Sequence, residues 1–133
     1  MKKTILFAAA CALAWPAAGL AFVAENRLPV NSVSAAEFEV VARGGTGTKA
    51  YWCAAADFAE SQGAKANTRL YVVEGPGPSA SIPGRTAVRF TTDPNAAGVT
   101  PVTPQLVLSV DVVGDNLAVV SAKQYCYQAL RKS

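Results

Sequence analysis

The stretch that says most about the fold is TKAYWCAAADFAESQ, residues 48–62. Its apolar side chains recur at helical spacing, at Trp52, Ala55, Ala56 and Ala59. This spacing predicts an amphipathic helix from Lys49 to about Gln62, with Thr48 as its N-cap and Gly63 as its stop. The alanines of this helix imply that another element approaches it closely.

A second helix is expected near the end of the chain. Ser121, followed three residues later by Gln124, matches the capping-box pattern, which predicts a helix that reaches about Arg131. Its inward-facing residues would include Val120, Tyr125 and Ala129. Residues 117–120, which precede the pattern, fit either a short strand or the start of this helix.

Cys53 and Cys126 would lie on these two helices, and a disulfide between them would join helix to helix. The chain-entropy model gives about 4 kcal/mol for a loop of this length. That is a large share of the roughly 5–15 kcal/mol that a small domain has in total. A reactive thiol is the alternative, but the chain has no histidine that could activate one.

The first 21 residues have the order of a secretory signal peptide. Lys2 and Lys3 precede an apolar stretch from Ile5 to Trp15, and Pro16 separates that stretch from small residues. We expect cleavage after Ala21. The apolar stretch is short for a membrane span, which needs about 20 residues.

Cleavage after Ala18 or Ala24, an uncleaved anchor, and lipid attachment at Cys11 are the alternatives. Loss of this segment leaves ten basic and nine acidic side chains, so the net charge falls from +3 to +1. Such a balance gives no reason to expect nucleic acid as a partner. Cys11 is lost too, and the remaining pair of cysteines suits an oxidising compartment. We therefore expect a periplasmic or secreted protein with no membrane span after cleavage.

Alternation of apolar and polar residues predicts four strands. They cover Glu37–Ala42, Arg69–Glu74, Thr86–Thr91 and Gln105–Val113. The last is the clearest, with Leu106, Leu108, Val110 and Val112 on one face. Residues 22–36 show little periodicity and are expected to be a leader. We therefore predict one small α+β domain over residues 37–133: a mostly antiparallel four-stranded sheet with both helices on one face, tied by the disulfide.

One motif suggests a phosphate or anion site. Residues 45–50, GTGTKA, follow a strand and open a helix, as in the G-x-G-x-x-G/A dinucleotide fingerprint, and Glu74 ends the next strand. The acids in the preceding strand and the small size of the domain argue against a dinucleotide. A glycine-rich turn is the simplest interpretation. An anion site at the helix N-terminus is the intermediate one, and its residues would be Arg43, Gly45, Thr46, Gly47, Thr48 and Lys49.

Aromatic residues flank both cysteines and suggest either one core around the disulfide or an aromatic ligand site. They are Tyr51, Trp52, Tyr125 and Tyr127. With no histidine and both thiols in a disulfide, we expect no metal and no catalytic triad. We also expect no cofactor.

The run from Tyr51 to Ala59, together with Gly114-Asp115-Asn116-Leu117 and Tyr125-Cys126, resembles small exported bacterial proteins of the alphaproteobacterial type. The resemblance covers most of the mature chain. It implies export and paired cysteines, and it brings no activity, cofactor or site.

Three functions are compatible with these observations. The first is a non-catalytic binding or interaction module, whose partner would be an envelope or extracellular macromolecule or a small ligand. The second is an extracytoplasmic hydrolase that uses carboxylates, with Asp57 and Glu60 as the pair. The third is an inhibitor of an external enzyme that presents Gly75–Gly84 as a loop stiffened by its prolines.

Overall fold

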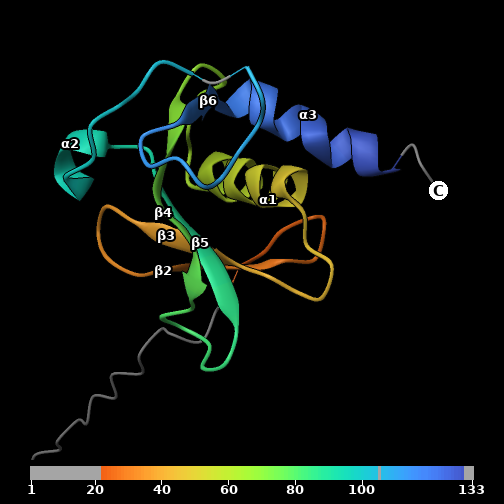
Figure 1. Ribbon diagram of the computed structural model, residues 1–133. Helices are drawn as coiled ribbons and strands as arrows, with labels where there is room; N and C mark the ends of the chain where they lie inside the picture. The colour runs from red at the N-terminus through yellow and green to blue at the C-terminus, as the bar shows by residue number, and fades with distance from the viewer. Residues whose placement is uncertain (1–21, 105, 131–133) are drawn as a thin grey trace, which may run out of the picture.

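The computed structural model describes residues 22–104 and 106–130. The expected signal peptide lies outside these ranges, with Cys11 and the preferred cleavage site after Ala21. Within them, six strands form one sheet in the order β1-β2-β3-β5-β4-β6 (Figure 1). The strands are β1 (Phe22–Val23), β2 (Pro29–Ser32), β3 (Phe38–Val41), β4 (Arg69–Pro78), β5 (Thr86–Thr91) and β6 (Asn116–Ala118). Every neighbouring pair is antiparallel, which confirms the α+β class.

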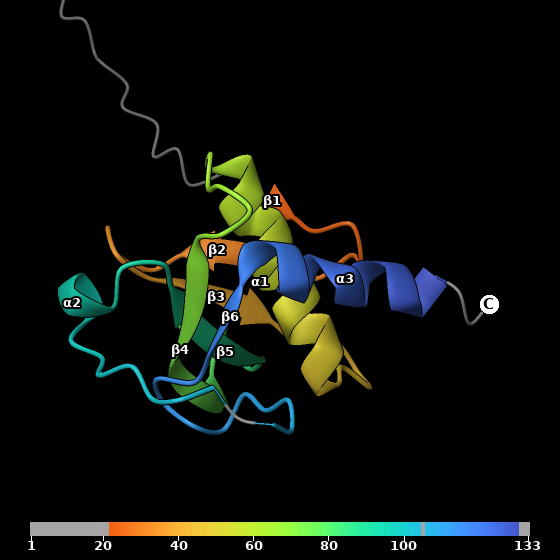
Figure 2. The same cartoon turned by 90° about the horizontal axis from the view of Figure 1, so that it is seen from above.

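The helices are α1 (Thr48–Ser61), the short α2 (Pro94–Ala97) and α3 (Val119–Leu130). They do not lie side by side on the sheet: α1 lies between the sheet and α3 (Figures 1 and 2). Because α1 is covered on both sides, eight of its residues are buried. This explains its alanines, since small side chains let two layers approach one helix closely.

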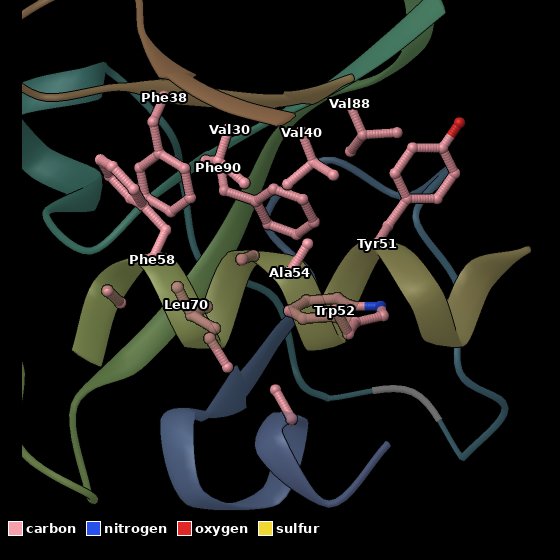
Figure 3. Packing of buried hydrophobic residues seen from close by; sticks show 14 of the residues in the cluster. Val30, Phe38, Val40, Tyr51, Trp52, Ala54, Phe58, Leu70, Val88 and Phe90 are labelled. Carbon is pink, nitrogen blue, oxygen red and sulfur yellow. The ribbon is translucent and has the colours of Figure 1, made fainter. Parts of the chain in front are cut away.

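The core fills the space between α1 and the sheet (Figure 3). Phe38 from β3 contacts Phe58 from α1, with ring centroids 4.7 Å apart. Phe90 from β5 meets the edge of Trp52 at 5.1 Å. The buried indole of Trp52 donates a hydrogen bond to the carbonyl of Ser109 at 3.0 Å, so its polar atom is satisfied inside the core.

The disulfide between Cys53 and Cys126 is confirmed and joins α1 to α3, with 5.0 Å between the Cα atoms. Both cysteines are buried. The buried Val119 and Ala122 belong to the same apolar cluster. Val120 is 48% exposed, so the expectation that it faces inward was wrong: the buried face of α3 runs through Val119, Ala122 and Cys126, at helical spacing, and Val120 lies off that face.

The leader expected over residues 22–36 is part of the sheet. β1 and β2 form a hairpin, and Val30 of β2 lies opposite Val40 of β3. Leu28 and Val30 are buried. Strands this short carry little periodicity of their own, and they are stabilised by pairing with the strands that adjoin them in the sheet. The sheet therefore has six strands rather than four.

The strand expected over Gln105–Val113 was wrong. Gln105 lies outside the described residues, and residues 106–113 form a loop in which Leu106 and Val107 are almost fully exposed. A continuation of β6 would have to pair with the end of β4, where Pro76 and Pro78 have no N–H to donate. A turn bond from the N–H of Asp115 to the carbonyl of Val112 also ends the ladder there.

Candidate functional site

A pocket of about 810 Å³ opens at the start of α1. We call it the α1 pocket. It lies where four segments meet: the β1–β2 hairpin, the β3–α1 loop, the first turns of α1, and α3. Its lining residues are Asn26, Arg27, Leu28, Arg43, Gly44, Gly45, Thr46, Gly47, Thr48, Lys49, Ala50, Cys53, Tyr125 and Gln128. All six residues of the anion site expected from the sequence are therefore in one pocket.

The β3–α1 loop is shaped by Thr46 and its glycines. The Thr46 hydroxyl donates to the Arg43 carbonyl at 2.7 Å and accepts from the Arg43 N–H at 2.8 Å. Gly45 has a φ of +80°, a conformation that strains most other residues. The loop thus turns tightly and delivers the chain into α1.

The N-terminus of α1 has no side-chain cap. Gly47 is the N-cap residue, so the expected capping role of Thr48 was wrong. The Gly47 carbonyl accepts from the N–H groups of Ala50 and Tyr51. Within the described residues the N–H groups of Thr48 and Lys49 have no partner. Two unsatisfied N–H donors therefore lie at the positive end of α1, beside the pocket.

Among the described residues, three cations line the pocket and no acidic residue does. Arg27, Arg43 and Lys49 form no ion pair in the part of the chain that the structure describes. The other described cations, with one exception, have partners: Arg69 binds Asn116, Arg85 binds the Ala42 carbonyl, Arg89 pairs with Glu37 and Glu74, and Lys123 pairs with three carboxylates. The exception is Lys65. Arg69 and Arg85 bind neutral groups and so keep their charge, but the side chains of Arg27, Arg43 and Lys49 have neither an ion pair nor a hydrogen bond among the described residues, and all three line one pocket.

Arg27 sits in the hairpin in a left-handed conformation, with a φ of +72°. Glycine normally occupies such a position, because a side chain there costs energy. The hairpin is attached to α1 by Asn26, whose amide donates to the Ala50 carbonyl at 2.9 Å. An arginine in a strained conformation is therefore held beside the start of the helix.

The wall opposite the hairpin comes from α3. Tyr125 and Gln128 line it, and the Lys49 ammonium lies 5.9 Å from the centre of the Tyr125 ring. The disulfide fixes this wall relative to α1, since Cys126 is the neighbour of Tyr125.

The four aromatic residues do not form one site. Tyr51 and Trp52 are buried in the core, and burial raises the pKa of the Tyr51 hydroxyl. Tyr125 lines the α1 pocket, while Tyr127 is 48% exposed. The core interpretation fits the pair on α1, and of the four aromatic residues Tyr125 is the one that lines the α1 pocket.

The topology excludes the dinucleotide interpretation. That site needs two adjacent parallel strands joined through the helix. β3 precedes α1, but its neighbours are β2 and β5, and both are antiparallel to it. Glu74 lies on β4 and pairs with Arg89 at 3.7 Å, so it is not beside the glycine-rich turn.

The carboxylate pair expected for a hydrolase is engaged in ion pairs. Asp57 lies 2.8 Å and Glu60 2.9 Å from the ammonium of Lys123, and Glu25 completes the group at 3.0 Å. We call these four residues the Lys123 cluster. Neither Asp57 nor Glu60 lines the α1 pocket. The ion pairs of the Lys123 cluster therefore join α1 to α3 and to the β1–β2 hairpin.

The segment expected as an inhibitory loop, Gly75–Gly84, is partly strand, since β4 extends to Pro78. Its next residues fold over the buried carboxylate of Glu39. The Ser79 hydroxyl donates at 2.6 Å, the N–H groups of Ala80 and Ser81 donate at 2.9 Å, and the Ser81 hydroxyl donates as well. These bonds tie the segment down onto the sheet.

The sequence pointed to the loop of residues 43–49 but missed Asn26, Arg27 and Gln128 as pocket residues. No local pattern marks them, because they come from elements far away in the chain. An arginine at a hairpin position that favours glycine is the one signal, and it requires knowledge of the hairpin.

Within residues 22–104 and 106–130 no three or more His, Cys, Asp or Glu side chains are arranged so that they could hold a metal ion. In the same ranges no helix is long and apolar enough to cross a bilayer. Comparison with protein-family models, with curated proteins and with solved structures found no match to this chain.

Proposed function

We propose that the mature chain is an exported, non-catalytic binding domain that holds a small anionic ligand in the α1 pocket. The observation that carries the proposal is the gathering of Arg27, Arg43 and Lys49 around one pocket whose described lining includes no acidic residue. Like charges placed together repel one another and reduce stability. An anion bound among them would remove that repulsion.

The backbone supports the same ligand chemistry. The N–H groups of Thr48 and Lys49 lack partners among the described residues, and α1 has no acidic residue in its first turn. An anion placed there would accept hydrogen bonds and interact favourably with the helix dipole.

A binding role fits the chain better than catalysis. The sequence has no histidine, and the acids Asp57 and Glu60 are held by Lys123. Export is supported by the N-terminal sequence and by the disulfide, since such bonds persist in oxidising compartments.

Thermal unfolding in the presence of different anions tests the proposal. We expect citrate or phenyl phosphate to raise the Tm of the wild type more than chloride does at equal ionic strength, because a ligand that binds only the folded state stabilises it. The double variant R43Q/K49Q should lose this increase. Lys65→Gln is the matched control, since Lys65 is also unpaired but lies outside the pocket. An equal increase in Tm for R43Q/K49Q and wild type would contradict the proposal.

A further inference from the structure

We infer that the ligand of the α1 pocket is an organic anion with an apolar body, and that a bare inorganic anion is not its natural occupant. This inference rests on the proposed function and adds the ligand class. It follows from the size of the pocket and from the division of its lining into two kinds of surface.

The pocket is too large for an inorganic anion alone. Its volume of about 810 Å³ falls in the range of about 300–1,000 Å³ that is typical of sites for small organic molecules. A phosphate or sulfate ion would fill a small part of that space and leave the rest to water. A ligand that carries an organic body beside its anionic group would fill that space and displace the water from it.

The lining has a charged part and an apolar part. Arg27, Arg43 and Lys49 supply the charge. Leu28, Ala50 and Tyr125 supply apolar surface, and Leu28 also belongs to the buried core. A molecule with an anionic group and an apolar body would match both parts, whereas a bare anion would match only one.

Tyr125 gives the apolar part a flat face. Its ring is partly buried against the core, and aromatic rings stack well on such a face. The ring is also held in place, because the adjacent Cys126 is bonded to Cys53 on α1. A fixed wall reduces the cost of ordering the site when a ligand binds.

Three probes separate the two contributions: phenyl phosphate, inorganic phosphate and phenol, each titrated calorimetrically into the full mature chain. We expect phenyl phosphate to bind at least about tenfold more tightly than inorganic phosphate, because only it buries an apolar ring. Phenol should bind more weakly than phenyl phosphate by a similar factor, because it lacks the charge.

Variants on α3 assign the effect to the wall of the pocket. Tyr125→Ser should reduce the preference for phenyl phosphate over inorganic phosphate, and Tyr125→Phe should preserve it. Tyr127→Ser is the matched control, since Tyr127 lies two residues away and faces solvent. The circular dichroism spectrum and Tm of each variant identify any that fail to fold. If Tyr125→Ser fails to fold, Tyr125→Phe keeps the test valid.

The possible results distinguish a failure of the inference about the ligand class from a failure of the proposed function. Equal affinity for inorganic phosphate and phenyl phosphate would overturn the inference and leave the proposed function standing. Equal affinity for phenol and phenyl phosphate would overturn the proposed function, since charge would then contribute nothing. Absence of binding by all three probes at millimolar concentration would overturn both.

Discussion

Positive charge lies at two places along α1, and the fold neutralises it at one of them. In the Lys123 cluster, one ammonium lies within 3.0 Å of three carboxylates. In the α1 pocket, three cations face no carboxylate among the described residues. The hairpin contributes to both, since Glu25 joins the cluster and Arg27 lines the pocket. The comparison separates charge that holds the fold together from charge that is left for a partner.

The two ends of α1 show the same contrast between neutralised and unneutralised charge. α1 has Lys49 in its first turn and Glu60 in its last, with no acid at its start and no base at its end. This placement opposes the helix dipole at both ends. At the C-terminal end, Lys123 of α3 supplies the positive charge that the last turn of α1 lacks. The N-terminal end has no such negative charge, and a bound anion would supply it.

Removal of the disulfide should have the largest effect, because α3 supplies Lys123 to the cluster and Tyr125 to the pocket. The variant C53S/C126S should lose up to about 4 kcal/mol of unfolding free energy, measured by urea denaturation. Reduced wild-type protein is the control and should match the variant. A loss below about 1 kcal/mol would show that packing alone holds α3 on α1.

Lys123→Met should have the next largest effect. It leaves three carboxylates close together without their cation, and a loss of roughly 2 kcal/mol is expected by urea denaturation. Affinity for phenyl phosphate should not change. Lys65→Met, at an unpaired lysine, is the control and should be nearly neutral. An unchanged stability would mean that the cluster is not structural.

The pH dependence of the Lys123 contribution has a defined sign. Burial alone would lower the pKa of Lys123, but its bonds to Asp57, Glu60 and Glu25 outweigh burial and raise the pKa above its usual value of 10.5. A raised pKa stabilises the folded state below 10.5 and loses that effect as the pH rises through the folded value. At neutral pH the contribution of this lysine is therefore complete.

Glu39→Gln should have a smaller effect that depends on pH. Burial alone would raise the pKa of Glu39, but the bonds from Ser79, Ala80 and Ser81 lower it below its usual value of 4.5. The stabilisation is thus present above pH 4.5 and is lost as the pH falls through the folded value. We expect Glu39→Gln to cost about 1–2 kcal/mol at pH 7.

The stability difference between wild type and Glu39→Gln should shrink as the pH falls below 4.5, when denaturation is followed across that range. Glu74→Gln is the control, because the Glu74 side chain is 62% exposed and should show little difference at any pH. A difference between wild type and Glu39→Gln that is independent of pH would contradict this account.

Arg27→Gly should have the smallest effect on stability, and in the opposite direction. Glycine relieves the left-handed strain, so the unfolding free energy should stay equal or rise by up to about 1 kcal/mol. Affinity for phenyl phosphate should fall, because a pocket cation is lost. Arg27→Lys keeps both strain and charge and is the control for calorimetry and denaturation. Unchanged affinity in Arg27→Gly would remove Arg27 from the site.

Local patterns predicted the elements that rest on local physics. The period of Trp52, Ala55 and Ala59 predicted α1, and the alternation of Val88 and Phe90 predicted β5. The same alternation failed for Leu106 and its neighbours, because a strand also needs a partner edge. Pro76 and Pro78 make the adjoining edge of β4 unsuitable for pairing. A sequence pattern indicates which conformation a segment favours. It does not indicate which strands or helices will pack beside that segment.

The candidate site divides in the same way. The turn from Arg43 to Lys49 is continuous in the chain, so its glycines and basic residues were visible as a motif. Arg27 and Gln128 reach the pocket only because the hairpin and α3 pack on either side of α1. The absence of carboxylates from the described lining is a property of that packing, and composition alone, with a net charge of +3 over the whole chain, gives no sign of it.

Chemical-shift mapping with phenyl phosphate tests most directly whether the unpaired cations are kept for an anion. On addition of the ligand to the ¹⁵N-labelled protein, we predict that the largest amide shifts occur within residues 44–50, with smaller ones at Arg27 and Tyr125. The amides around Lys123 should not move. Shifts centred on the Lys123 cluster, shifts spread evenly over the surface, or no shifts at all would contradict the account.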